Sequence, residues 1–257
     1  MRLLAFGVFG LLIGSFLTVV IHRVPRNEGI ARGRSKCPSC GAEIRAVDNI
    51  PVVSWLLLRG RCRACKAPIS PEYPLTEAAT AALFLAAAAV FEPLHLAIGA
   101  AAFLAVMLAV AFIDARHRIV PNRIIYPSLA VFAVAIGVGD LLDGGVSFVE
   151  GLIGVVAYSL PLLLVALIAP GGMGMGDVKL TALIGLVLGA LDLSLVVVAA
   201  GAGILGGGLG AIVAMAVLRY GRKQQMPFGP FLAAGAALSL LIGDAISRAY
   251  LSLVGLS

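Results

Sequence analysis

The sequence predicts an all-α polytopic membrane protein of about eight transmembrane helices, with a small cysteine-containing domain between the first and second helices. Its 257 residues are 61% hydrophobic and only 12% charged, and the mean hydropathy is +1.06. Soluble domains carry about 25% charged residues. Several apolar runs reach or approach the ~20 residues that a transmembrane helix needs. The cysteines all lie in one basic segment outside those runs.

Eight apolar runs predict the spans. They lie near residues 3–21, 75–91, 95–113, 123–140, 147–169, 178–192, 194–218 and 230–247. The sixth is the shortest, because its apolar part, 180–191, gives only about 18 Å of helix against a hydrocarbon core of about 30 Å. Either Asp177 and the glycines before it lie below the membrane surface, or the bilayer thins there. In the seventh run, Gly206-x-x-x-Gly210 predicts close packing with another helix.

The positive charges predict the topology. The first run has no small-residue cleavage site after it and is followed by basic residues, so we expect a retained helix whose N-terminus lies outside. Eight crossings then leave the loops 22–74, 114–122, 170–177 and 219–229 in the cytoplasm. Of the 19 Lys and Arg residues, only Arg2 and Arg248 fall outside, which leaves 19 − 2 = 17 inside or at the inner boundary. The positive-inside rule therefore favours both termini outside.

The same distribution argues against a nucleic-acid partner. The net charge is +6, but the basic residues lie in short loops between apolar runs, where they determine orientation.

Four cysteines predict a metal site. Cys37 and Cys40 form one C-x-x-C pair, Cys62 and Cys65 form another, and 21 residues separate the pairs. Thiolates at this spacing can bind one tetrahedral Zn²⁺, and four cysteine ligands make a closed, structural site. Two disulfides are the first alternative, which a reducing cytoplasm disfavours. Two thioredoxin-like motifs are the second, which the lack of a βαβ pattern disfavours.

The cysteine segment is expected to lie against the membrane. Residues 22–76 carry ten Lys and Arg and four acids, and four thiolates with one Zn²⁺ lower the resulting charge of +6 to about +4. A segment with this charge is attracted to anionic membrane lipid. Because it has few large apolar residues, we expect metal binding to supply much of its folding free energy.

Two aspartates lie at the ends of predicted spans on the same membrane face. Asp114 follows an uninterrupted apolar run, and Asp177 follows a methionine- and glycine-rich stretch at 171–176. Taken singly, Asp114 is explained as a solvated residue at a helix end and Asp177 as a favourable charge at a helix N-terminus. Taken together, two carboxylates in a partly dry site share a proton and can activate water, as in aspartic peptidases.

The residues around Asp177 suit such a site. Gly174 and Gly176 let the backbone approach a ligand and adopt positive φ, so an extended substrate could pair with it. Lys179 either orients a substrate or tunes an aspartate, and its alternative explanation is a positive charge that sets orientation.

The ordered set of motifs resembles the type IV prepilin peptidases. It comprises Gly174-x-Gly176-Asp177-x-Lys179, a preceding Asp114 with Pro121 seven residues later, and the two C-x-x-C pairs. Further matching segments lie at 14–23 (GSFLTVVIHR), 48–55 (DNIPVVSW), 59–65 (RGRCRAC), 69–77 (ISPEYPLTE) and 227–231 (PFGPF). The family usually has Asn where Thr18 stands and often has Asp where Asn122 stands.

The resemblance implies a bifunctional enzyme of the bacterial inner membrane. It would remove the basic leader of prepilins or pseudopilins and N-methylate the new terminal amine with S-adenosylmethionine. Asp114 and Asp177 are then the catalytic aspartates, and the four cysteines bind the zinc ion. Glu77 is a candidate for methyl transfer, although an acidic residue in the first turn of a helix is an equally good explanation.

The resemblance also implies three parts. Residues 1–21 form the first helix, 22–76 a cytoplasmic zinc domain associated with methyl transfer, and 77–257 the membrane-embedded aspartic peptidase. Three other functions stay open: a non-enzymatic scaffold whose zinc knot docks a partner, a transporter that uses the two aspartates as a proton relay, and a peptidase without methyltransferase activity.

Overall fold

The structure is a computed structural model, which describes all residues except 31–34, 143, 169–172, 218–225 and 254–257. The described residues form helices and two isolated β-bridges, with no strand among them. They divide into two compact units, Met1–Ala105 and Val106–Ser257. The predicted all-α membrane fold is confirmed.

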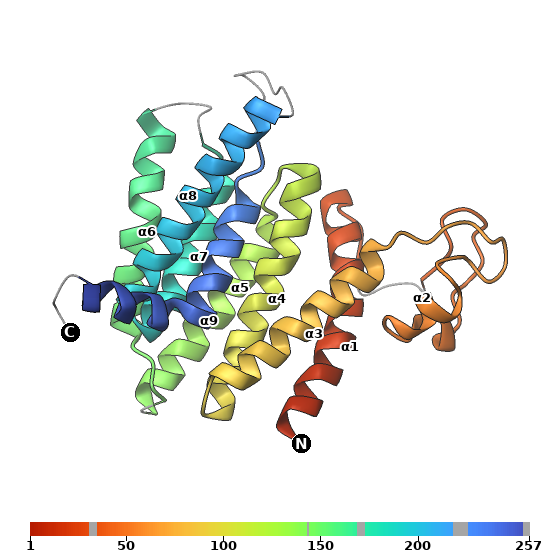
Figure 1. The fold of residues 1–257 in the computed structure, drawn as a ribbon, viewed down its shortest axis with the longest axis horizontal. Helices are drawn as coiled ribbons and strands as arrows, with labels where there is room; N and C mark the ends of the chain where they lie inside the picture. Colours follow the sequence, from red (N-terminus) through yellow and green to blue (C-terminus); the bar gives the residue numbers. More distant parts are fainter. Residues whose placement is uncertain (31–34, 143, 169–172, 218–225, 254–257) are drawn as a thin grey trace. The chain divides into compact units, whose positions relative to one another are not determined.

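The first unit is built on two long helices that lie side by side, α1 (Arg2–Arg23) and α3 (Glu72–Val90) (Figure 1). Between them the chain forms three short helices, η1 (Val24–Arg26), η2 (Ala46–Asn49) and α2 (Val53–Leu57), and α4 (Leu94–His117) begins in this unit.

Glycines bring α1 and α3 into backbone contact. A Cβ on Gly10 would lie 2.6 Å from the Cα of Ala81, and one on Gly14 would lie 2.7 Å from the Cα of Glu77. Because any larger side chain would push the helices apart, these two glycines fix the position of Glu77 relative to α1.

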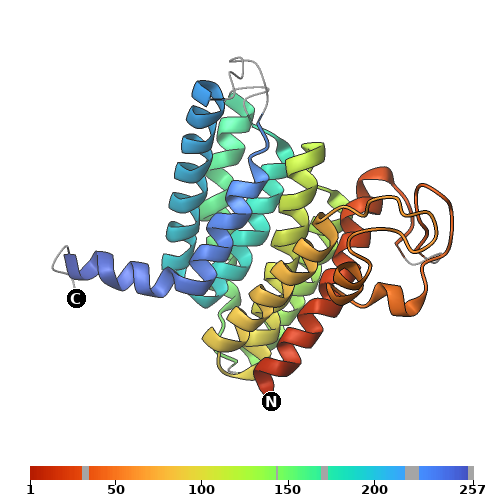
Figure 2. The same ribbon diagram turned by 45° about the vertical axis from the view of Figure 1, so that its right-hand side comes forward.

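The second unit contains the end of α4, α5 (Asn122–Leu141), α6 (Phe148–Ile168), α7 (Met175–Leu191), α8 (Leu193–Val217) and α9 (Gly229–Leu253). Helix α7 contacts α5, α6, α8 and α9 and lies among them in both ribbon views (Figure 2). Its side chains are buried along most of its length. Since Asp177 lies in its first turn, the best-packed helix of the unit positions this carboxylate.

The contact between α6 and α7 is made by glycine backbone. A Cβ on Gly154 would lie 2.2 Å from the carbonyl oxygen of Gly185, and a Cβ on Gly185 would lie 2.3 Å from the carbonyl oxygen of Gly154. Because these atoms belong to backbone, only a displacement of one helix could accommodate a methyl group.

We therefore expect Gly154→Ala to lower the free energy of unfolding by about 1–3 kcal/mol, the usual cost of overpacking. Unfolding in mixed detergent, followed by circular dichroism, measures the change. Gly201→Ala in α8 is the matched control, because a Cβ there would have no neighbouring atom within 4 Å. Equal stability of the two variants would contradict this packing.

The helices differ from the predicted spans at two places that matter for function. Seven described helices are long and apolar enough to cross a membrane, and α7 is not among them. It has 17 residues, which give about 26 Å of helix. It begins at Met175, so it includes Gly176 and Asp177, which lie before the predicted span 178–192. Helix α4 continues one turn beyond Asp114 to His117, where basic residues suit the negative end of the helix dipole.

The predicted close packing at Gly206 and Gly210 takes a different form. A Cβ on either residue would lie beside the ring of Phe231 in α9, at 3.6 Å for Gly206 and 2.4 Å for Gly210. The backbones of α8 and α9 approach instead at Gly203 and Gly235, where a Cβ on Gly235 would lie 2.7 Å from the Gly203 nitrogen. The glycines at 206 and 210 make room for an aromatic side chain.

Candidate active site and metal centre

Asp114 is buried near the C-terminal end of α4, with 5% of its surface exposed. The backbone N–H of Gly229 donates a hydrogen bond to Oδ2 of Asp114 over 2.9 Å. Gly229 is the first residue of α9, so the carboxylate lies at the positive end of that helix dipole. A Cβ at position 229 would lie 2.7 Å from the same oxygen, so only glycine fits there without displacing Asp114.

Asp177 has a comparable arrangement at the start of α7. Gly174 is the N-cap residue of this helix, and its backbone forms a hydrogen bond with the Asp177 carboxylate. In the other direction, the backbone N–H of Asp177 donates to the Gly174 carbonyl over 3.0 Å. Only the bond from the Asp177 side chain to the N-cap residue corresponds to a capping box, because glycine has no side chain to supply the other bond. Both aspartates thus accept a glycine amide at a helix N-terminus.

The second unit brings the two carboxylates together. Asp114 and Asp177 belong to the same compact unit, and they lie near enough for the charge of Asp114 to act on Asp177. Val120 helps to position α7, because a Cβ on Gly176 would lie 2.8 Å from the Cβ of Val120. Gly176 is therefore a contact point between α7 and the segment that follows Asp114.

Gly174 and Gly176, the described glycines before Asp177, do not use the freedom of glycine to adopt positive φ. Gly174 has φ −78° and ψ 137°, and Gly176 lies within α7. Each of these glycines meets a steric requirement instead: a Cβ on Gly174 would lie 3.3 Å from Asp177 Oδ2, and Gly176 faces Val120.

Lys179 is held by α5. Its Nζ donates a hydrogen bond to Oδ1 of Asn122 over 3.1 Å and lies 5.3 Å from the centre of the Tyr126 ring, within the range of a cation–π interaction. These contacts connect α7 to α5 two residues beyond Asp177.

The four cysteines of the first unit lie at two equivalent turns. In the first turn, the N–H of Cys37 donates to the Ala42 carbonyl and the N–H of Gly41 to the Cys37 carbonyl. In the second, Cys62 donates to Ala67 and Lys66 to Cys62 in the same pattern. An isolated antiparallel bridge closes each turn. Two such turns present four sulfur atoms to one point.

The sulfur geometry fits a single tetrahedral metal ion. The four Sγ atoms lie within 4.8 Å of one another, and those of Cys37 and Cys65 are 3.8 Å apart. Zinc–sulfur bonds of about 2.3 Å in a tetrahedron place the sulfurs about 3.8 Å apart. Backbone N–H groups of Cys40 and Ser39 lower the pKa of the Cys37 thiol to about 6. Against the lowering effect of the Ala67 backbone, the neighbouring thiols raise the pKa of the Cys65 thiol to about 11, because thiols held this close together cannot all ionise easily.

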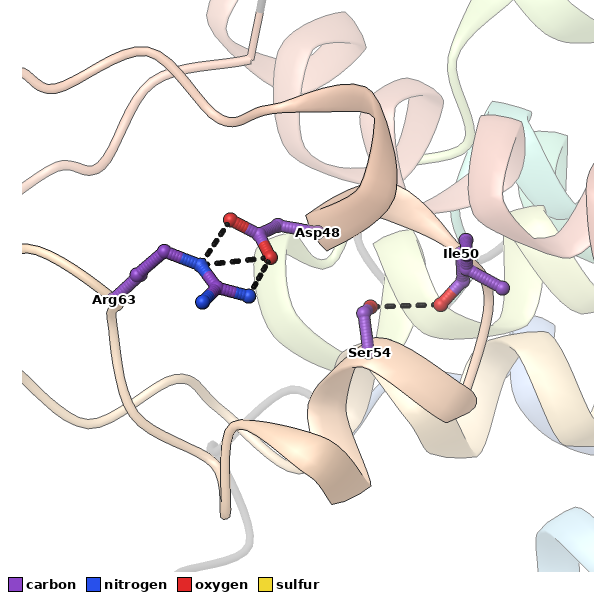
Figure 3. Close-up of polar contacts among 4 residues, drawn as sticks. All are labelled: Asp48, Ile50, Ser54 and Arg63. Carbon is purple, nitrogen blue, oxygen red and sulfur yellow. Dashed lines mark hydrogen bonds and ion pairs between the residues drawn. The ribbon is translucent and has the colours of Figure 1, made fainter.

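A bidentate ion pair connects the second cysteine turn to helix η2. Arg63 donates from Nε to Oδ2 of Asp48 over 2.9 Å and from Nη2 to Oδ1 over 2.6 Å (Figure 3). Hydrogen bonds from Arg63 lower the pKa of the Asp48 carboxyl. Just beyond η2, the backbone N–H and hydroxyl of Ser54 both donate to the Ile50 carbonyl. The sequence gives no obvious signal for this pairing, because 15 residues separate the partners.

Glu77 is also buried, with 7% of its surface exposed. It lies in the second turn of α3, and its Oε2 accepts a hydrogen bond from the backbone N–H of Val52 over 2.7 Å. The Ser15 side chain of α1 forms a second hydrogen bond with this carboxylate. Glu77 therefore lies beyond the first turn of α3, and two hydrogen bonds hold its carboxylate.

Comparisons with known proteins identify the family. The family model for the bacterial peptidase A24 N-terminal domain matches residues 8–91, and that of the type IV leader peptidase family matches residues 101–211. A prepilin leader peptidase/N-methyltransferase of Aeromonas hydrophila is 36% identical over 95% of this chain and 92% of its own length. One of Bacillus subtilis is 36% identical over 96% of both chains. The chain belongs to the type IV leader peptidase family. No solved structure matches it.

In this leader peptidase, sequence reasoning missed the function of Gly229. The segment 227–231 was recognised only as a matching motif, whereas the structure shows that its glycine donates to Asp114. A glycine placed between two prolines at the start of an apolar run was the available signal. The Asp residue to which it donates is 115 positions away, so the sequence alone could not identify that partner.

Proposed function

We propose that this chain is a membrane aspartic endopeptidase that removes the leader of type IV prepilins or pseudopilins and then N-methylates the new N-terminal residue with S-adenosylmethionine. One observation carries the peptidase assignment: two interacting carboxylates, Asp114 and Asp177, each receive a glycine amide at the start of a helix. The names of the relatives support the methyltransferase assignment.

In the proposed mechanism, the two aspartates share one proton. The ionised carboxylate takes a proton from water as the water oxygen attacks the scissile carbonyl carbon, and the protonated one donates a hydrogen bond to the carbonyl oxygen. The tetrahedral intermediate then collapses, the C–N bond breaks, and a proton passes to the leaving amine. Gly229 and Gly174 position the carboxylates, while Gly176 and Lys179 support this arrangement by holding α7 in place.

We further propose that the four cysteines bind one structural Zn²⁺. Four thiolates complete a tetrahedral zinc site and leave no position for water, so the ion stabilises the fold and takes no part in the reaction. The segment it stabilises has short helices and isolated bridges, which supply little packing of their own.

Cys62→Ser should remove the zinc and expose the segment between α1 and α3 to protease, because three sulfurs bind zinc much more weakly than four. Metal analysis of the purified protein should give one zinc per wild-type chain, and limited proteolysis with mass spectrometry should locate the new cuts. Ala64→Ser, an exposed change in the same turn, is the control and should keep its zinc. Retention of a full equivalent by the Cys62 variant would contradict the site.

The proposed location is the bacterial inner membrane, with the zinc segment and the aspartates on the cytoplasmic side, both termini outside and membrane lipid around the helices. The distribution of basic residues supports this orientation. We assign residues 22–76 to zinc binding and methyl transfer and residues 77–257 to the peptidase, in which both aspartates lie.

Incubation of the detergent-solubilised protein with a prepilin-type peptide and labelled S-adenosylmethionine tests both activities. We expect loss of the leader between glycine and phenylalanine and one labelled methyl group on the new amine. Cleavage without label would leave a peptidase only. No cleavage by a folded, zinc-containing protein would favour a non-enzymatic scaffold.

A further inference from the structure

We propose that a cavity within the first unit binds S-adenosylmethionine, with the Glu77 carboxylate facing its sulfonium group. This site rests on the proposed methyltransferase function and gives that function a location. The cavity measures about 430 Å³, within the range of small-molecule pockets in proteins, about 300–1,000 Å³. It is formed by residues of the first unit alone, from α1, α3 and the segment between them.

The lining of the cavity matches the charges of this ligand. S-adenosylmethionine has a positive sulfonium, an ammonium group, a carboxylate and a flat adenine ring. Glu77 and Glu28 line the cavity and offer negative charge, while Arg23 and Lys36 offer positive charge. Asp48 also lines the cavity, but its carboxylate is already paired with Arg63. A pocket that carries both signs of charge suits a zwitterion with one additional positive charge.

Glu77 is fixed in the orientation that cation binding requires. The Val52 N–H and the Ser15 side chain hold its carboxylate, and Gly14 places α1 against its backbone. A carboxylate that is already held in place loses little conformational freedom when it meets a positive ligand.

The donor to Glu77 has an unusual backbone conformation. Val52 has φ 60° and ψ −50°, and a positive φ is rare for a β-branched residue. Such strain is commonly found at ligand sites. The conformation directs the Val52 N–H toward Glu77, which lines the cavity, so an unfavourable backbone geometry holds this carboxylate.

Trp55 offers an aromatic face. It lines the cavity, and its Nε1 donates to the Ile69 carbonyl over 3.2 Å. Gly60, with φ +65°, lies behind the ring, where a Cβ would approach Cζ2 to 2.8 Å. A ring held in this way can stack on adenine or contact a cation. Trp55 is the sole tryptophan of the chain, so its fluorescence reports directly on the cavity.

Titration of the full-length, zinc-loaded protein tests the site through Trp55 fluorescence, with calorimetry as a second readout. The probes are S-adenosylmethionine and S-adenosylhomocysteine, whose thioether carries no charge. We expect Glu77→Gln to weaken binding of S-adenosylmethionine by on the order of tenfold, because a charge-assisted contact is lost. Binding of S-adenosylhomocysteine should weaken much less. Thr18→Phe, which fills the cavity from α1, should weaken both. Glu72→Gln, an exposed change in α3, should weaken neither.

The outcomes separate this site from the proposed function. The wild-type protein could cleave and methylate a prepilin peptide while Glu77→Gln and Thr18→Phe leave the binding constants for both probes unchanged. That result would overturn the site but not the methyltransferase function. Wild-type protein that cleaves but neither binds nor uses the methyl donor would overturn both. Equal weakening for both probes in Glu77→Gln would overturn the assignment of the sulfonium to Glu77.

Discussion

Replacement of either Asp114 or Asp177 by asparagine is expected to lower leader cleavage by about 1,000-fold or more, because general acid–base catalysis needs both carboxylates. Asparagine keeps the shape of the side chain, and its carbonyl oxygen can still accept the glycine amide that holds each aspartate. The loss should therefore come from chemistry. Cleavage of a prepilin-type peptide by purified, solubilised variants gives the rates.

Asp244→Asn is the matched control for these variants. Asp244 is an exposed residue of α9, and its replacement should leave cleavage unchanged. Circular dichroism and zinc content should be the same for all three variants. If Asp114→Asn retained substantial activity while Asp177→Asn had none, the paired-carboxylate mechanism would be wrong and a single catalytic carboxylate would replace it.

Gly229→Ala is expected to lower cleavage by about 100-fold, the effect of moving a catalytic group by about 1 Å. The new Cβ would lie 2.7 Å from Oδ2 and 3.0 Å from Cγ of Asp114, so the carboxylate must move. The hydrogen bond from the backbone N–H would lengthen at the same time. Because alanine favours helix, the variant should still fold.

Gly201→Ala provides the comparison for this change. It adds the same methyl group in a helix of the same unit, at a position with open space. Cleavage by this control should equal that of the wild type. An active Gly229→Ala variant would mean that Asp114 tolerates displacement and that the glycine amide has no function in positioning it.

The long helices could be predicted from the sequence because their signal is local. Apolar runs of sufficient length predict membrane spans without knowledge of their neighbours, and seven of the eight runs correspond to helices of spanning length. The start and the burial of helix α7 could not be predicted from local hydropathy. Its start depends on Val120, which packs on Gly176, and its buried surface depends on four surrounding helices.

Much of the metal site could also be predicted, because short spacing restricts geometry. A C-x-x-C turn brings two sulfurs together by local backbone hydrogen bonds alone. That the two turns meet depends on the segment between them, in which Asp48 binds Arg63.

By itself, the sequence determined the all-α membrane class, the two cysteine turns and the choice of Asp114 and Asp177 as candidates, because hydropathy, short spacing and motif order are properties of nearby residues. Tertiary structure alone decided which atoms hold those residues: the Gly229 amide at Asp114, the Val52 amide at Glu77 and the cavity beside it. Contacts between distant residues depend on helix packing, which brings together positions that the linear pattern leaves unrelated.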